Sequence, residues 1–254
     1  TEYALGFLLT TEECLTLLRR IRHCISTEET RYYLNGVHLS VAGNMLRATA
    51  TDGHRLARVK MPAPAGAGSM PAAGVIIPQK TIGVLFEMLR RGDDLVELAF
   101  SSGDKKPHGL FRRGHVTLRA AMIDGTYPDT DKVIPKENDQ IATLDTKALA
   151  GLLRRVTAIF SSNAAAGVHL KLTPAGRLTI DAGDRLWESA TGNIAAAYDG
   201  PGFEVGFSRR YLGDLLKVSG EQVRIAFSDP GSPVLFTDPA DASCLHVLMS
   251  MRVV

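Results

Sequence analysis

The chain repeats itself with a period of about 130 residues, and this repeat restricts the folds that it can adopt. In two segments, apolar residues recur at helical spacing, and every position in the second segment lies 135 residues after its counterpart in the first. The first set is Cys14, Leu17, Leu18, Ile21, Cys24 and Ile25, and the second is Leu149, Leu152, Leu153, Val156, Ile159 and Phe160. Each copy is therefore predicted to contain an amphipathic helix at the same place.

Three short motifs recur in the same order, so the repeat extends beyond one helix. Residues 36–39 (GVHL), 53–56 (GHRL) and 99–101 (AFS) are matched by residues 167–170 (GVHL), 183–186 (GDRL) and 226–228 (AFS), with offsets of 131, 130 and 127. Ordered matches whose offsets drift so little indicate two copies of one fold. The polar stretch PKEND is the predicted boundary, which gives one domain over residues 1–136 and a second over residues 137–254.

Each copy follows the order strand, helix, several strands, helix, several strands. In the first copy, Thr10 and Glu13 form a predicted capping box at the start of a helix, and Pro78 precedes a second helix. Runs of strands interrupted by single helices predict an α+β fold, with antiparallel sheets and the helices on one face. We expect helices over residues 12–25, 79–91, 145–160 and 208–218, and first-copy strands over residues 2–9, 31–40, 45–51, 56–61, 75–77, 95–100, 109–113 and 115–121.

The composition is typical of a soluble globular protein, because 45% of the 254 residues are hydrophobic and 22% are charged. The sequence has no apolar run of about 18 residues, so we expect no transmembrane helix, and no leader typical of secretion. The three cysteines, Cys14, Cys24 and Cys244, lack metal-ligand spacing and indicate a reducing, cytoplasmic compartment. Because the chain begins with Thr1 and not with methionine, we expect a fragment or a processed protein.

Positive charge is concentrated in the predicted helices. They hold twelve basic and five acidic side chains, a net charge of +7, whereas the remaining residues carry −5 and the whole chain carries +2. One interpretation is that acids at helix N-termini and bases at C-termini complement the helix dipoles on solvated faces. The other is that a basic layer of helices faces the phosphates of duplex nucleic acid. Because no aromatic residues alternate with the basic ones, stacking on single-stranded bases is not expected.

The common signatures of catalysis and cofactor binding are absent from the sequence. It contains no GxxxxGK[ST], GxGxxG, GxSxG or HExxH motif, and its seven histidines lack ligand spacing, so no cofactor and no metal are expected. Residues 50–57 (ATDGHRLA) do place Asp52, His54 and Arg55 together, which would suit a hydrolase with a general base, its carboxylate and an anion clamp. No nucleophile accompanies them. A tight turn at Asp52, with Arg55 paired to a carboxylate and Leu56 packed, is therefore favoured, and no catalytic residue is assigned.

Four segments make the chain resemble a known family. They are residues 31–36 (RYYLNG), 50–57 (ATDGHRLA), 124–129 (DGTYPD) and 247–252 (VLMSMR). Together they are similar to the bacterial DNA polymerase III β subunit, the sliding clamp, and the resemblance covers the second and third of that family's three domains. It implies two clamp domains, each with antiparallel sheets on the outer side and two helices on the inner side, around a hole that holds duplex DNA.

The resemblance implies a non-enzymatic processivity clamp of DNA replication. Its implied partners are duplex DNA, bound without sequence preference, and the polymerase III catalytic subunit, the clamp loader, translesion polymerases and repair proteins. In this family such proteins dock through a short peptide similar to Gln-x-x-Leu-Phe, in a cleft between the second and third domains. The helix residues expected to face DNA are Arg19, Arg20, Arg22, Lys80, Arg90, Arg91, Arg154, Arg155, Arg209, Arg210 and Lys217.

The resemblance also assigns residues to the peptide cleft. Its Leu/Phe pocket would consist of Arg31, Leu34, Thr51, Gly53, His54, Arg55, Leu56, Pro128, Val133, Val247 and Met249, and its Gln-side subsite of Ser208, Tyr211, Val234, Met251 and Arg252. Three positions of the cleft depart from the usual family pattern, because Lys132 replaces an arginine, Ser208 an asparagine and Ser250 a proline. The apolar pocket is retained.

The family closes its ring as a dimer, in which the first domain of one subunit joins the third domain of the next. Because the chain resembles the second and third domains only, we expect a monomer that has the peptide cleft but does not form the usual ring dimer. Two alternatives remain at this point: a trimer of two-domain chains, which would also supply six domains, and a simple basic module that binds short linear duplex DNA tightly.

Overall fold

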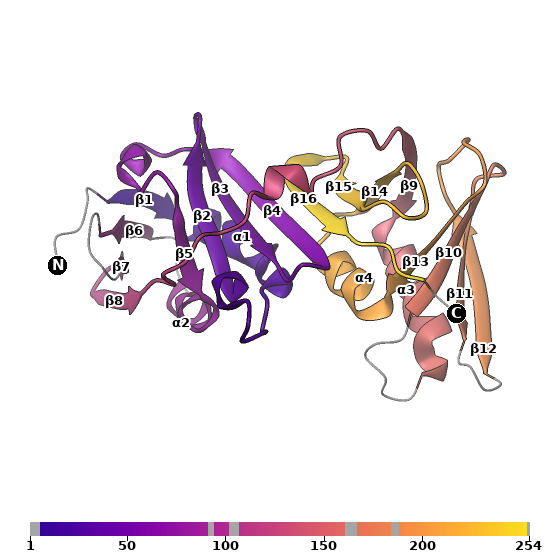
Figure 1. The fold of residues 1–254 in the computed structure, drawn as a ribbon, viewed down its shortest axis with the longest axis horizontal. Coiled ribbons are helices and arrows are strands. Elements are labelled where there is room, and N and C mark those ends of the chain that lie inside the picture. Colours follow the sequence, from indigo (N-terminus) through magenta and orange to yellow (C-terminus); the bar gives the residue numbers. More distant parts are fainter. Residues whose placement is uncertain (1–5, 91–93, 102–106, 161–166, 184–187, 253–254) are drawn as a thin grey trace. The chain divides into compact units, whose positions relative to one another are not determined.

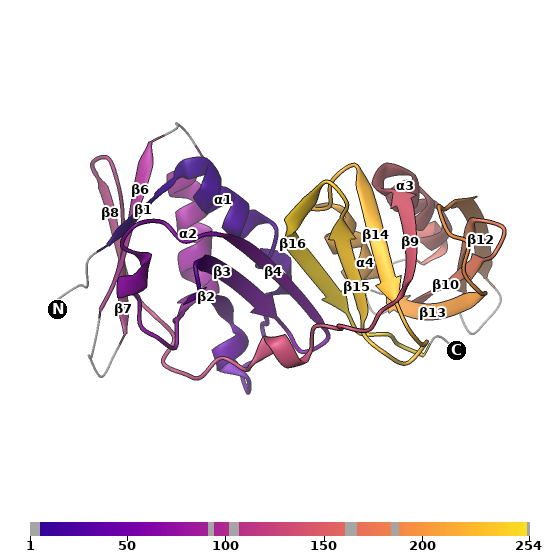
Figure 2. The ribbon, with the colours of Figure 1, turned by 90° about the horizontal axis from the view of Figure 1, so that it is seen from above.

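The computed structural model of the protein describes residues 6–90, 94–101, 107–160, 167–183 and 188–252. The chain folds into two compact units, Thr1–Pro128 and Asp129–Val254. Figures 1 and 2 show both units in the colours of the sequence, with the first in indigo to magenta and the second in pink to yellow. Within the described residues, each unit contains two α-helices and two sets of four antiparallel strands.

The first unit contains the elements predicted for the first copy. Its helices are α1 Thr11–Arg19 and α2 Gln79–Leu89, with short 3-10 helices η1 Arg22–Cys24, η2 Tyr32–Leu34 and η3 Ala67–Ser69. One sheet pairs β1 Phe7–Thr10, β6 Leu95–Phe100, β7 His108–Arg113 and β8 Val116–Ala121 in that order. The other set pairs β5 Val75–Pro78, β2 Gly36–Ala42, β3 Met45–Thr51 and β4 Arg55–Pro62 in that order.

The second unit repeats this arrangement. Its helices are α3 Thr146–Val156 and α4 Arg209–Leu216, with 3-10 helices η4 Thr130–Lys132 and η5 Thr157–Ile159. One set of strands pairs β9 Gln140–Asp145, β14 Gln222–Phe227, β15 Val234–Asp238 and β16 Asp241–Leu248 in that order. The other sheet pairs β13 Phe203–Ser208, β10 Gly167–Thr173, β11 Arg177–Gly183 and β12 Ser189–Ala195 in that order.

Strand register confirms that the two units are copies of one fold. Gly36 lies opposite Pro78, and Gly167 lies opposite Ser208. Pro78 and Ser208 also occupy equivalent positions in the helices, because each is the N-cap of the second α-helix of its unit. The predicted α+β class and the predicted duplication are therefore both confirmed.

In each unit, the segment that follows the last strand forms a backbone hydrogen bond with the strand that precedes the second α-helix. In the first unit the Ile123 nitrogen donates to the Ile76 carbonyl oxygen, on β5, at 2.9 Å. In the second unit the Met251 nitrogen donates to the Gly206 carbonyl oxygen, on β13, also at 2.9 Å. Both segments thus run beside the strand that leads into the second helix.

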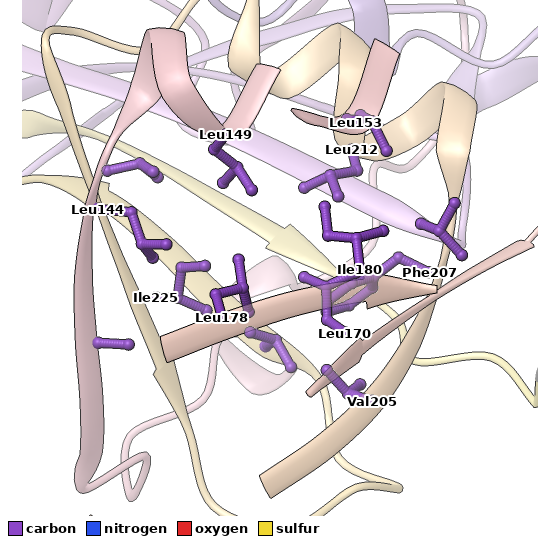
Figure 3. Packing of buried hydrophobic residues seen from close by; sticks show 14 of the residues in the cluster. Leu144, Leu149, Leu153, Leu170, Leu178, Ile180, Val205, Phe207, Leu212 and Ile225 are labelled. Atoms are coloured by element: carbon purple, nitrogen blue, oxygen red, sulfur yellow. The ribbon is translucent and has the colours of Figure 1, made fainter. Parts of the chain in front are cut away.

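The core of the second unit shows how the helical pattern is used. Leu149 and Leu153 of α3 and Leu212 of α4 point toward Leu170 and Ile180 of the sheet, as Figure 3 shows. All five are buried. Burying a leucine or isoleucine side chain contributes roughly 1.5–3 kcal/mol. The apolar stripe therefore attaches both helices to the sheet and leaves their charged faces to solvent.

The α-helices end earlier than the apolar stripes predict. α1 was expected over residues 12–25 but ends at Arg19, and η1 follows it. α3 was expected over residues 145–160 but ends at Val156, and η5 follows. The stripe continues past both ends in steps of three residues, and side chains three apart share a face in an α-helix and in a 3-10 helix alike. Apolar spacing alone could not distinguish them. The helices expected over residues 79–91 and 208–218 are also shorter in the structure.

Two predicted strands of the first unit also need correction. The strand expected over residues 31–40 begins only at Gly36, because residues 32–34 form η2, in which the Leu34 nitrogen donates to the Arg31 carbonyl oxygen at 2.9 Å. The two tyrosines there have high strand propensity, which this local turn overrides. The strand expected over residues 2–9 is β1; residues 1–5 lie outside the described residues.

The capping box at the start of α1 is confirmed and allows a first prediction. The Thr10 Oγ1 accepts from the Glu13 nitrogen at 3.1 Å, and the Glu13 carboxylate accepts from the Thr10 nitrogen at 2.7 Å. Thr10→Ala should lower the free energy of unfolding by about 1 kcal/mol, measured by urea denaturation followed by circular dichroism. Thr16→Ala, within the same helix, is the control and should be neutral or slightly stabilising. Equal losses from both variants would contradict the role of the cap.

Candidate functional site

The turn at residues 51–56, here called the β3–β4 turn, is shaped by side-chain hydrogen bonds. The Asp52 Oδ1 accepts from the His54 nitrogen at 2.9 Å and from the Arg55 nitrogen at 3.0 Å. The Asp52 Oδ2 accepts from Arg55 Nε at 2.9 Å. Thr51 Oγ1 donates to the Arg55 carbonyl oxygen at 2.7 Å and accepts from the Gly53 nitrogen at 3.1 Å. The predicted tight turn is confirmed, and Asp52 is the carboxylate that Arg55 binds.

These bonds argue against the hydrolase alternative. A catalytic carboxylate would have to orient the His54 imidazole, as in a general-base pair. The Asp52 carboxylate already binds two backbone amides of its own turn and the Arg55 guanidinium, which is a structural role. Short acidic side chains commonly stabilise turns in this way. The geometry therefore explains why an acid, a glycine, an imidazole and a guanidinium lie so close together without assigning them a reaction.

Arg31 is brought to the β3–β4 turn from η2, although it lies more than twenty residues away in sequence. Its Nη2 donates to the Asp52 carbonyl oxygen at 3.2 Å, and its Nε donates to Glu28 Oε2 at 2.9 Å. Gly53 has a φ of 89°, and a Cβ built there would lie 2.4 Å from Arg31 Nη1. The positive φ favours glycine at this position, and a larger residue there would displace the end of the Arg31 side chain. Sequence reasoning missed Glu28, whose only signal is its spacing of three residues from Arg31.

The predicted residues of the first unit differ in how much a ligand could reach them. Leu34, Thr51, Arg55 and Leu56 are buried. Gly53, His54 and Pro128 are exposed, and Arg31 is partly exposed. A ligand could therefore reach the exposed residues directly, whereas the buried ones are covered by the rest of the unit.

The predicted residues of the second unit lie at the start of α4 and at the end of β16. The Ser208 Oγ accepts from the Tyr211 nitrogen at 3.5 Å, which makes Ser208 the N-cap of α4. Val234 and Val247 are buried on neighbouring strands β15 and β16. The Met251 nitrogen binds the Gly206 carbonyl oxygen, two residues before Ser208. Within this unit, the structure therefore brings the segment after β16 close to the start of α4.

Several of these second-unit side chains are large, apolar and exposed. Val133 is 49% exposed, Met249 42% and Met251 38%. Lys132 is exposed and forms an ion pair with Asp129 at 3.5 Å, Arg252 is exposed, and Ser250 is partly buried. Among the described residues, nine large hydrophobic side chains are exposed, and these three all fall at predicted positions. Their exposure leaves these apolar side chains accessible to a partner.

The basic residues predicted to face DNA lie on or directly beside the helices. Those that are exposed are Arg19, Arg22, Lys80, Arg90, Arg154, Arg155, Arg210 and Lys217, while Arg20 and Arg209 are partly buried. Arg91 lies outside the described residues. The four α-helices hold seven basic and four acidic side chains, a smaller surplus than predicted, because Arg20, Arg22, Arg90 and Lys217 fall just beyond the helix ends. The DNA-facing role of these residues stays a prediction.

In both units, an arginine lies over a phenylalanine ring between the two helical regions. The Arg22 guanidinium, in η1, is 4.7 Å from the centre of the Phe86 ring in α2. The Arg209 guanidinium, at the start of α4, is 5.4 Å from the centre of the Phe160 ring, next to η5. In the first unit the arginine comes from the first helical region and the ring from the second, and in the second unit this assignment is reversed. Such contacts contribute about 0.5–1 kcal/mol at exposed sites. Sequence reasoning did not anticipate these rings as partners of the basic residues.

None of the helices in the described part of the chain is long and apolar enough to cross a membrane. Among the same residues, no group of three or more histidine, cysteine, aspartate or glutamate side chains is arranged to hold a metal ion.

Two family models match the chain. The central domain of the DNA polymerase III beta subunit matches residues 9–129, and its C-terminal domain matches residues 131–252. A beta sliding clamp of Caulobacter vibrioides is 40% identical over 248 residues, which cover 96% of this chain and 64% of the relative. The beta sliding clamp of Escherichia coli K12 is 32% identical over 237 residues, which cover 93% and 62%. The chain thus spans just under two thirds of the length of these relatives.

Solved structures give the same result. A crystal structure of the Caulobacter crescentus beta sliding clamp matches with a TM-score of 0.91 and 39% identity, over 99% of this chain and 66% of that chain. A sliding clamp from Bartonella birtlesii, bound to griselimycin, matches with a TM-score of 0.92 and 34% identity, over 100% and 68%. At this level of identity the likeness extends to sequence as well as fold.

Proposed function

The chain belongs to the DNA polymerase III beta subunit family, and we propose that it serves as part of a processivity clamp in bacterial DNA replication. The observation that carries the proposal is the end-to-end match of the two repeated units to the central and C-terminal domains of that family. As a clamp it would hold a polymerase on duplex DNA by encirclement and would catalyse no reaction. Because replication takes place on the bacterial chromosome, we place the protein in the cytoplasm.

We propose that the helices face the DNA. Their exposed arginines and lysines suit phosphate contacts that do not depend on base sequence. A surface of this kind attracts the duplex electrostatically without fixing the protein at one site, which suits a clamp that slides. The arginines held over Phe86 and Phe160 would present their charge in a restricted orientation.

We further propose that the predicted cleft residues of both units bind a short peptide of the Gln-x-x-Leu-Phe kind. The β3–β4 turn with Arg31, and the exposed Val133, Met249 and Met251, would contact its apolar side chains. Burying each large side chain contributes roughly 1.5–3 kcal/mol, and ordering a flexible peptide removes much of that gain. The expected affinity is therefore micromolar, which allows polymerases, the clamp loader and repair proteins to exchange on one clamp.

Peptide titration tests this proposal. Met249→Ala and Met251→Ala should each raise the Kd of a fluorescein-labelled Gln-x-x-Leu-Phe peptide about three- to tenfold in fluorescence polarisation, since each removes apolar area worth about 1 kcal/mol. Because both side chains are well exposed, thermal stability should barely change. Val116→Ala is the matched control, since Val116 is 55% exposed on β8 and has no predicted role. Failure of the unmodified protein to bind at tens of micromolar peptide would contradict the docking function.

A further inference from the structure

The segment that follows β8, residues 122–127, is attached to the rest of the first unit at four points. The Met122 nitrogen donates to the Pro107 carbonyl oxygen at 2.7 Å. The Ile123 nitrogen donates to the Ile76 carbonyl oxygen at 2.9 Å. Gly125 passes so close to η2 that a Cβ built on it would lie 3.1 Å from the Tyr33 Cβ. The Tyr127 ring stacks on the His38 ring, with 4.7 Å between ring centres and 10° between ring planes. We call this segment the strap.

The stacked pair is partly buried. His38 Nε2 donates to the Ala73 carbonyl oxygen at 2.9 Å, which orients the imidazole under the tyrosine. Burial lowers the pKa of His38, the positive charge of Arg58 lowers it further, and the bond to Ala73 opposes them. A lowered pKa favours the neutral form of this imidazole at pH 7.

Tyr127 also touches the β3–β4 turn. Its hydroxyl lies beside the backbone of Thr51, where burial raises the pKa of the phenol. Within the described residues, that hydroxyl has no hydrogen bond of standard geometry. A buried hydroxyl without a good partner adds no stability and can cost some. The stacked ring gives Tyr127 its extensive contact with this unit, and the hydroxyl adds a weak one to the Thr51 backbone.

The strap therefore touches both parts of the predicted site in this unit. Gly125 contacts η2, which contains Leu34 and follows Arg31, and Tyr127 contacts the base of the β3–β4 turn at Thr51. Pro128, itself a predicted site residue, directly follows Tyr127. We propose that Tyr127 is a positioning residue of the peptide site, whose ring, stacked on His38, holds η2, the β3–β4 turn and Pro128 in register. This inference rests on the proposed docking function and adds a residue that does not itself contact the peptide.

The test compares Tyr127→Ala with Tyr127→Phe in two measurements. In the protein without peptide, the amide NMR signals of Gly53, His54 and Arg55 report the β3–β4 turn, because these amides donate to Thr51 and Asp52. Tyr127→Ala should shift these signals and raise the peptide Kd at least fivefold. Tyr127→Phe, which keeps the stacked ring, should leave the signals in place and the Kd within twofold. His38→Ala should act in the same direction as Tyr127→Ala, and the double variant should be no worse than Tyr127→Ala alone.

A destabilised control separates positioning from general loss of structure. Phe111→Leu, in the core of the other sheet of this unit, should lower the melting temperature but leave the turn signals and the Kd unchanged. The proposal is overturned if Tyr127→Ala leaves the turn signals unchanged, or if Tyr127→Phe disturbs them as much as Tyr127→Ala does. Failure of the unmodified protein to bind peptide would instead overturn the docking function, while the NMR comparison would still decide whether the strap holds the turn.

Discussion

Asp52→Ala is expected to lower the free energy of unfolding of the first unit by about 3–5 kcal/mol, the usual cost of removing one partner from a buried ion pair. The Arg55 side chain is only 5% exposed and the Asp52 side chain 14%, so water can replace the lost carboxylate poorly. The substitution also removes the acceptor for the His54 and Arg55 amides. Because the β3–β4 turn would lose its three bonds to the Asp52 carboxylate, the peptide Kd should rise at least tenfold in the protein that remains folded.

Stability of the first unit is best followed by circular dichroism and amide hydrogen exchange, because the only tryptophan is at position 187, in the second unit. Glu87→Ala is the matched control: it breaks the pair between Glu87 of α2 and Arg90 just after it, whose side chains are both 69% exposed, and it should cost less than about 1 kcal/mol. Asp52→Asn keeps an acceptor for the two amides but loses the charge. Its loss in free energy of unfolding should lie between those of Asp52→Ala and Glu87→Ala. A loss for Asp52→Ala no larger than that for Glu87→Ala would show that the turn does not depend on this pair.

Gly36→Ala is the second substitution with a large expected effect, a loss of about 3 kcal/mol through overpacking. Gly36 begins β2 and pairs with the end of β5, and a Cβ built on it would lie 2.3 Å from the Ile77 carbonyl oxygen and 2.9 Å from the Ile77 carbonyl carbon. Both atoms belong to the backbone of the neighbouring strand, so no side-chain rotation can relieve the clash. The strands would have to separate at the point where β5 leads into α2.

Gly83→Ala provides a control of opposite sign. Gly83 lies within α2, and a Cβ there would meet no atom within 4 Å. Alanine in place of glycine inside a helix should stabilise by about 0.5–1 kcal/mol. Urea denaturation of both variants should therefore give changes of opposite sign. A stability for Gly36→Ala equal to that of the unmodified protein would mean that β2 and β5 can move apart without cost.

Much of the fold follows from patterns that are local in sequence. The apolar stripes, the capping residues Thr10 and Asp145 and the alternation within the strands each depend on neighbours only a few residues away. The repeat strengthened these predictions, because the same order of helices and strands could be inferred independently from each copy. The same is true of the β3–β4 turn, whose bonds join Thr51, Asp52 and Arg55 within five residues. Such features could therefore be predicted without knowing what packs against them.

The ends of the helices could not be predicted in this way. Ile21 and Cys24 are buried, as the stripe of the first helix requires, but they achieve this in a 3-10 turn beyond Arg19. 3-10 turns are common at the ends of α-helices, so the apolar spacing does not show where the α-helix stops. This earlier end moved several basic residues off the helices and reduced the charge surplus that the sequence suggested.

By itself, then, the sequence determined the duplication, the α+β class, the tight turn at Asp52 and the likeness to the beta subunit family, because each is written in short-range spacing or in motifs. Only the tertiary structure decided that Arg31 meets Gly53 and that Tyr127 stacks on His38. It also decided that each unit holds an arginine over a phenylalanine ring, with the arginine in the first helical region of the first unit and in the second helical region of the second unit. Those contacts join residues that are between about twenty and ninety positions apart. Loop closure and side-chain packing bring such residues together, and neither leaves a periodic signal in the chain.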